Sequence, residues 1–274
     1  MTIRKLSAGR GAGWITDGLA VFKANPRPYL LACLLIGLVS SLPLIGIFFG
    51  LLMPVLYAGL LSVLHRQARG EATSPSQAFD GFQEPGAFLR LLPIVLFNLA
   101  FALLVVLILV VTVGAAVYQM VRAGQAAHPD PQMLLALLPK FALLLAILMP
   151  VGIFVSWILM LAIPHAMLGK QPGLIALREA AAAVMANLLP LLVNLLCLML
   201  LLFLILLIMM IPMLLLGALQ QHSSLLSFMI QIPLMALFTG GILALYCAIM
   251  YQAWREIFGE DADAATAPPS IFAA

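Results

Sequence analysis

Charged side chains are scarce in this chain. Asp, Glu, Lys and Arg make up 8% of its 274 residues, whereas soluble globular domains carry about 25%. Apolar residues account for 65% of the sequence, which excludes an ordinary soluble domain. The apolar runs, such as 188–216, do not alternate with polar residues as the strands of outer-membrane barrels do. The composition therefore predicts an all-α polytopic membrane protein.

Cysteine is rare as well, and its placement excludes two kinds of site. Cys33, Cys197 and Cys247 each fall within an apolar run. Isolated thiols in such runs are small packing residues, so we expect neither a disulfide framework nor a metal site. The formal net charge is only +3, and the Lys and Arg residues are scattered along the chain. This distribution excludes a nucleic acid as a partner.

The residue patterns of catalytic sites are missing too. Asp and Glu occur only in the expected loops and tails, and none of the four histidines has a ligand-type residue at metal-binding spacing. The sequence contains no nucleophile elbow, no HExxH motif and no glycine-rich phosphate loop after a strand. We therefore expect no catalytic residue, no cofactor and no metal ion, and a protein that is not an enzyme.

Apolar runs long enough to cross a membrane are abundant. A hydrocarbon core of ~30 Å requires ~20 residues of helix. The first run is much longer than the apolar part of a signal peptide, so we expect it to remain in the mature protein. Proline, glycine and polar turns divide the runs, and we expect six transmembrane helices at 29–41, 47–64, 88–117, 134–163, 188–216 and 226–251. Gly46 and Gly50 have the spacing that lets two helices approach closely.

Short amphipathic segments precede some of these runs. The clearest is Gly13–Tyr29, with similar segments at 176–190 and, more faintly, at 75–92. We expect each to form an interfacial helix at the membrane surface, and an asparagine to form the corner before the next span. The interfacial anchors that this arrangement predicts are Trp14, Asn25, Asn187 and Trp254.

The recurring segments suggest internal repeats. We expect a single transmembrane domain at 13–258, built from three parallel units at about 14–69, 75–168 and 172–258. Residues 1–12 are expected to form a basic, flexible N-terminus, and residues 259–274 a disordered tail.

The distribution of positive charge predicts the orientation. With six spans, Arg122 and Lys140 lie on one side of the membrane and the other eleven of the 13 Lys and Arg residues lie on the side of the termini. Because short cytoplasmic loops carry the excess of Lys and Arg, both termini are predicted to be cytoplasmic.

Uncharged polar residues are the remaining candidates for a site within the membrane. Asn98, Asn194 and Gln231 are candidates to line a polar or lipid-sized cavity, although hydrogen bonding between helices is the simpler interpretation. His65 beside Arg66, and His165 near Lys170, have positions from which they could contact lipid phosphates. An ordinary interfacial polar residue is the simpler interpretation of both histidines.

Several motifs carry a resemblance to a known family. They are R-G-x-G-W-I-x-x-G-x-x-x-F-x-x-N-P at 10–26, Pro43-Leu44-Ile45-Gly46, Ala78-Phe79-x-Gly81-Phe82, and Trp254-Arg255-Glu256-Ile257-Phe258. Residues 10–258 thus resemble an uncharacterised family of proteobacterial multi-pass inner-membrane proteins. The surface-helix-then-asparagine pattern is also similar to the membrane domains attached to some glycerophosphodiester phosphodiesterases. The first resemblance implies a bacterial inner-membrane protein with no established activity, and the second carries over no catalytic residue.

Two functions follow as expectations. The first is a non-enzymatic membrane component that organises lipid or a protein partner, which includes a second copy of the chain. The alternative is a carrier or channel for a small or lipid-like molecule, with Asn98, Asn194 and Gln231 at its polar cavity.

Overall fold

The computed structural model describes residues 3–21, 26–42, 45–122, 131–220 and 224–259. Within these residues the chain is all-helical, as predicted, and contains no strand. The order of elements is α1 (Arg10–Val21), α2 (Pro26–Ser40), α3 (Ile45–Ala68), the 3-10 helix η1 (Pro75–Phe79), α4 (Asp80–Gln83), α5 (Ala87–Arg122), α6 (Pro131–Met167), α7 (Gly173–Ala186), α8 (Leu188–Gln220) and α9 (Ser224–Phe258).

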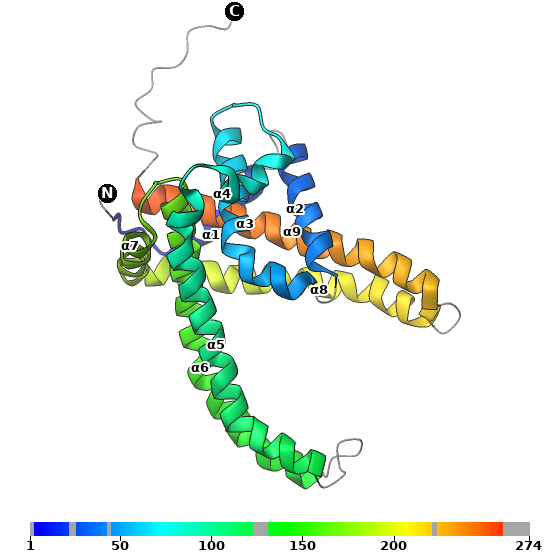
Figure 1. Cartoon of the computed structure of the whole chain (residues 1–274). Helices are drawn as coiled ribbons and strands as arrows, with labels where there is room; N and C mark the ends of the chain where they lie inside the picture. The colour runs from blue at the N-terminus through cyan, green and yellow to red at the C-terminus, as the bar shows by residue number, and fades with distance from the viewer. Residues whose placement is uncertain (1–2, 22–25, 43–44, 123–130, 221–223, 260–274) are drawn as a thin grey trace, which may run out of the picture.

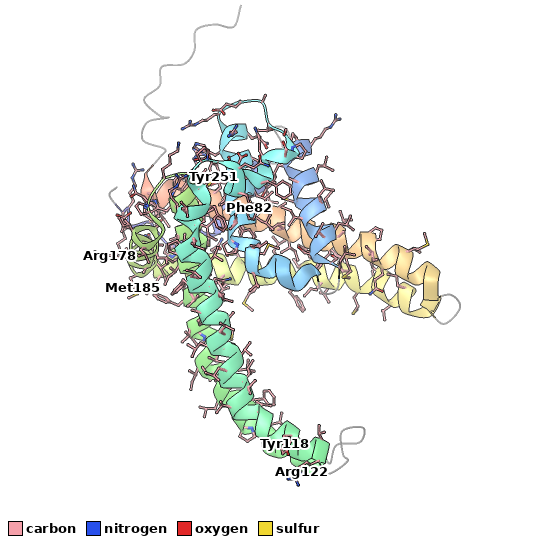
Figure 2. All side chains as sticks on the ribbon, viewed as in Figure 1. Phe82, Tyr118, Arg122, Arg178, Met185 and Tyr251 are labelled. Carbon is pink, nitrogen blue, oxygen red and sulfur yellow. The ribbon has the colours of Figure 1, made fainter. Side chains whose placement is uncertain are left out.

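Two long helical hairpins dominate the molecule. The α5–α6 hairpin and the α8–α9 hairpin extend from a shared region and point in different directions (Figure 1). Near the shared region α6 packs against α9, and the short helices α1 and α7 pack there as well. Tyr118 and Arg122 lie at the far tip of the α5–α6 hairpin, whereas Tyr251 lies where the hairpins meet (Figure 2).

Among the described residues, four helices are long and apolar enough to cross a membrane. The qualifying segments are Ala87–Gly114, Phe141–Met167, Leu188–Pro212 and Met229–Phe258. α5 has 36 residues, about 54 Å at 1.5 Å per residue, which exceeds the ~30 Å of a hydrocarbon core. α2 is apolar but has only 15 residues. The structure thus bears out four of the six expected spans by length and composition.

The buried core lies at one end of the hairpins. Its residues come from α1, α2 and α7, from the second half of α3, from the start of α5 and from the C-terminal parts of α6 and α9. Ala78 of η1 and Leu191 of α8 complete it. By contrast, large apolar side chains are exposed along most of α5 and α8. Such exposure is typical of helices whose outer faces contact lipid, because lipid tails are as apolar as the side chains.

Two glycines allow α2 and α9 to pack closely. A Cβ at Gly37 would lie 2.6 Å from the backbone nitrogen of Gly240, and a Cβ at Gly240 would lie 2.9 Å from the carbonyl oxygen of Cys33. The close approach predicted from the Gly46 and Gly50 spacing is not seen at Gly50, which has open space beside it.

The N-terminal segment differs from the flexible arm expected for residues 1–12. The backbone N–H of Arg4 donates to the carbonyl of Ile257 at 2.9 Å, and α1 already begins at Arg10. Residues 3–12 are therefore docked on α8 and α9. Most of the expected disordered tail, 260–274, lies outside the described residues.

Candidate functional site

A basic pocket lies where the C-terminal ends of α3 and α6 meet the start of α5. Its volume is about 290 Å³, at the small end of the range for sites that bind small molecules. Its walls are formed by Ser62, His65, Arg66, Arg69, Glu71, Glu84, Met167, Leu168 and Lys170. We call this site the Arg69–Lys170 pocket.

One wall is fixed by Asp80, at the start of α4. Ser62 Oγ donates to Asp80 Oδ2 at 2.8 Å, and Arg66 Nη2 donates to the same oxygen at 3.2 Å. Asp80 is largely shielded from solvent, while Arg66 remains 41% exposed. The carboxylate thus orients the guanidinium and leaves part of it open to the pocket.

A second ion pair fixes another part of the lining. Arg90 Nη2 donates to Glu84 Oε1 at 3.0 Å, and Arg90 Nε donates to the carbonyl of Ala166 at 3.3 Å. These bonds tie the first turn of α5 to the last turn of α6. The lining side chains of Ser62, Arg66 and Glu84 are therefore held by groups outside the lining.

Arg69 and Lys170 differ from these residues because neither forms an ion pair with any other described residue. Lys170 also has a φ of 52°, and no other non-glycine residue in the described ranges has a positive φ. A side chain in this left-handed region costs roughly 1–2 kcal/mol. Backbone strain of this kind is concentrated at functional sites, which supports a binding role for the loop that carries Lys170.

His65 lines the pocket and is largely neutral at pH 7. Burial, and next the positive charge of Arg69, lower the pKa of His65 below its ordinary value. Its Nδ1 lies 3.3 Å from the hydroxyl of Tyr251, whose ring contacts it edge-on. His65 is thus a neutral hydrogen-bonding group beside the cations of the pocket.

This arrangement suits an oxyanion. The positively charged donors of the pocket are Arg66, Arg69 and Lys170. Arginine in particular binds phosphate oxygens through its planar guanidinium group, which can form two parallel hydrogen bonds. The carboxylates of Glu71 and Glu84 lie in the same lining and would accept hydrogen bonds from an ammonium or hydroxyl group. No group of three or more His, Cys, Asp or Glu side chains in the described part of the chain is placed to hold a metal ion.

A second cavity, of about 240 Å³, lies among α3, α5, α6 and α9. It is lined by Met53, Pro54, Tyr57, Asn98, Ser156, Leu159, Met160, Ile163 and Tyr246. We call it the Asn98 cavity. The rings of Tyr57 and Tyr246 pack against each other across it, with centroids 5.6 Å apart.

The structure does not bring the three residues of the expected polar cavity together. Asn98 lines the cavity just described, whereas the buried Asn194 donates through Nδ2 to the carbonyl of Gly11 at 2.9 Å. Gln231 is exposed on α9. Only Asn98 therefore has a place at a cavity, and Asn194 instead holds the N-terminal segment.

The expected interfacial anchors are placed differently from one another. Trp14 and Trp254 are both fully buried, and their indole nitrogens donate to Glu256 at 3.0 Å and to His165 at 3.3 Å. Neither ring faces outward as an anchor would. Asn187 does form the corner between α7 and α8, where Nδ2 donates to Ala183. Asn25 lies outside the described residues.

The sequence did not indicate the pocket as one site. Of the two histidines considered as phosphate contacts, His65 lies in the pocket, but His165 is buried 2.5 Å from Glu179 Oε2 and stacks on Phe258. Arg69 and Lys170 are 101 positions apart. The sequence shows only that each of the two residues lies in a polar segment that follows an apolar run.

Comparisons with known proteins give no relative from which a function could be transferred. No protein-family model matches the chain, and neither the curated proteins nor the solved structures that were searched contain a match.

Proposed function

We propose that this chain is a non-enzymatic membrane protein that binds the phosphate-bearing head group of a lipid in the Arg69–Lys170 pocket. The observation that carries the proposal is the position of the pocket. It lies at the start of Ala87–Gly114 and at the end of Phe141–Met167, two of the segments long enough to span a membrane. Charged residues at span ends lie at the level of lipid head groups.

The proposal includes a finer topology with six spans. α2 and α3 have 15 and 24 residues, about 22 and 36 Å long, and would form a short, tilted hairpin beside the two long ones. Three units, each a short helix followed by a hairpin, match the order of the elements. The excess of Lys and Arg on one side supports a cytoplasmic position for both termini and the pocket. The sequence resemblance supports a bacterial inner membrane.

α7 supports a surface position for this part of the molecule. Its inner face is lined by small residues, while Leu174, Arg178 and Met185 are exposed. Figure 2 shows Arg178 and Met185 at the outer side of α7. An exposed face with both apolar and basic side chains is typical of a helix that lies in the membrane interface.

The test is a binding measurement with the head group alone. We expect glycerophosphoethanolamine, a soluble phosphodiester, to bind the purified protein saturably in an uncharged detergent, as measured by calorimetry. The double variant Arg69→Gln/Lys170→Gln should bind at least about tenfold more weakly, because hydrogen bonds to charged groups contribute about 1.5–3 kcal/mol each.

Arg178→Gln is the matched control, because it removes the charge of an exposed arginine on α7. It should leave binding unchanged. Equal binding by the wild type and the double variant would contradict the proposal, as would the absence of saturable binding.

A carrier for a lipid-like molecule is the second candidate, and the Asn98 cavity favours it. Pro54 lies inside α3 at this cavity, and proline removes a backbone hydrogen bond at which a helix can bend. Uptake of a labelled lysolipid into proteoliposomes, compared with empty liposomes, tests this function. Equal rates in the two preparations would contradict it.

A further inference from the structure

The Arg69–Lys170 pocket and the Asn98 cavity are neighbours along the same helices. On α6, Ile163 lines the cavity and Met167 lines the pocket. These residues are four positions apart, about 6 Å along a helix. On α3, Tyr57 lines the cavity and Ser62 lines the pocket, with a spacing of about 7.5 Å. The cavity therefore lies about one helical turn farther from the C-terminal ends of α3 and α6 than the pocket does.

The two sites differ in polarity in the same way as the charged head group and the apolar chain of a phospholipid. The pocket carries charged side chains, and the cavity has apolar walls with a few uncharged polar groups. The span Phe141–Met167 runs from the pocket past Ile163 and Ser156 toward the far tip of the hairpin. An amphiphile with its phosphate in the pocket would thus direct its chain along this span.

Three polar side chains of the Asn98 cavity lack hydrogen-bond partners among the described residues. The side chains of Asn98, Tyr57 and Tyr246 form no hydrogen bond with any other described residue. These three side chains are half-buried, so their polar groups are available to a ligand in the cavity. An amide and two phenol hydroxyls are suitable donors for the carbonyl oxygen of an ester.

From these observations we propose that one single molecule, a glycerophospholipid or its single-chain form, occupies both sites. Its phosphate lies in the Arg69–Lys170 pocket, and its ester group and the first carbons of a chain lie in the Asn98 cavity. This inference rests on the proposed function, because the pocket must bind the head group for the cavity to bind the ester of the same molecule.

The experiment compares two ligands that share one head group. Glycerophosphoethanolamine has no chain, and lysophosphatidylethanolamine has one chain joined by an ester. The variants Ser156→Leu and Asn98→Leu fill the cavity, and Ser156 is an exposed position that should tolerate the change. Both variants should bind the lysolipid at least about tenfold more weakly in native mass spectrometry, while their binding of glycerophosphoethanolamine in calorimetry stays unchanged.

Thr112→Leu is the matched control. Thr112 is also an exposed hydroxyl residue whose side chain bonds to its own helix, and it lies in neither site. It should leave the binding of both ligands unchanged. Retained head-group binding by the cavity variants shows at the same time that they are folded.

The outcomes separate the inference from the proposed function. If the cavity variants bind both ligands as the wild type does, the inference is wrong and the head-group site stands. If the wild type does not bind glycerophosphoethanolamine but binds the lysolipid in the cavity, both are wrong. We expect the cavity variants to bind only the lysolipid more weakly. We expect Arg69→Gln/Lys170→Gln to bind both ligands more weakly.

Discussion

The backbone N–H of Leu6 donates to Oδ1 of Asn187 at 2.8 Å, although the two residues are 181 positions apart. Nδ2 of Asn187 donates to the carbonyl oxygens of Arg4 and Ala183, at 3.0 and 3.1 Å. One buried amide thus satisfies three backbone groups. It joins the N-terminal segment to the corner at which α7 ends and α8 begins.

The first prediction concerns this amide. Asn187→Ala should lower the free energy of unfolding by about 1–3 kcal/mol, because it leaves backbone groups near Leu6 without a partner. It should also make the N-terminal segment more sensitive to limited proteolysis. Gln231→Ala is the control, since it removes an amide from an exposed position and should change the unfolding temperature little. Equal unfolding temperatures for the two variants would contradict the prediction.

A second prediction separates stability from binding at Lys170. Lys170→Gly removes a side chain from a residue with a φ of 52°. The relief of strain, roughly 1–2 kcal/mol, exceeds the entropic cost of glycine, roughly 0.5–1 kcal/mol. We expect thermal stability to stay the same or to rise slightly, while head-group binding falls by about tenfold. Weaker binding without a loss of stability identifies a residue whose side chain serves binding.

Arg178→Gly provides the comparison, because it places glycine inside α7. It should lower stability by about 1 kcal/mol and leave head-group binding unchanged. If Lys170→Gly binds as tightly as the wild type, Lys170 has no part in the site.

The third prediction is a pH dependence that comes from His65. Its lowered pKa keeps His65 neutral at pH 7, and a bound phosphate would favour the protonated ring. The charged groups that act on the ring are Arg66, Arg69, Glu71 and Arg255. Binding of glycerophosphoethanolamine should therefore strengthen as the pH falls below about 6.5, the ordinary pKa of histidine. The phosphodiester itself does not titrate in this range.

The lowered pKa of His65 has the opposite effect on stability, which falls as the pH falls. A histidine whose pKa is lower in the folded protein contributes stability above its unfolded pKa and loses it as the pH falls. The protein without ligand should therefore unfold more easily at pH 5.5 than at pH 7. Between these values, His65→Gln should remove the pH dependence of head-group binding and reduce that of stability, since the buried His165 remains in the variant. If the pH dependence is unchanged in His65→Gln, a group other than His65 causes it.

The sequence predicted the helices better than the site, for a physical reason. Length and apolar content determine whether a helix can cross a membrane, and both are local properties of runs such as 188–216. The pocket depends on which helix ends meet. Arg66 and Lys170 come together only because α3 and α6 pack side by side. No local pattern contains this pairing.

The burial of Trp14 also depends on a contact between distant parts of the sequence. A tryptophan on a short amphipathic segment is typical of an interfacial anchor. In the structure Glu256 accepts a hydrogen bond from its indole nitrogen, and Arg10 donates to the same carboxylate. Glu256, and then Asp17, raise the pKa of Arg10. This partner on α9 is distant in the sequence, so the burial of the ring could not be predicted from the segment alone.

The fourth prediction tests the contact between α2 and α9. Gly240→Ala should destabilise the protein, because the added methyl group would lie within 2.9 Å of the backbone atoms of Cys33 and Leu34. Overpacking of this kind typically costs about 1–3 kcal/mol. Gly241→Ala is adjacent, and nothing lies within 4 Å of its added methyl group. It should be neutral or stabilising in a thermal unfolding assay. Equal destabilisation by both variants would contradict the packing of these helices.

The last prediction tests the orientation on which the proposed function depends. A reporter fused after Gly70 should be cytoplasmic, since it follows the polar end of α3 in the loop that carries Arg69. A reporter fused after Gln125 should be external, because it follows α5 and the positive-inside rule assigns only Arg122 and Lys140 to that side. Phosphatase and fluorescent-protein fusions at the two sites give opposite signals for the two sides. If both fusions score as cytoplasmic, α5 does not cross the membrane, and the pocket at its first turn would lose its position at the head-group layer. If both signals are reversed, the pocket would face the outer leaflet, so the lipid it binds would have to come from that side.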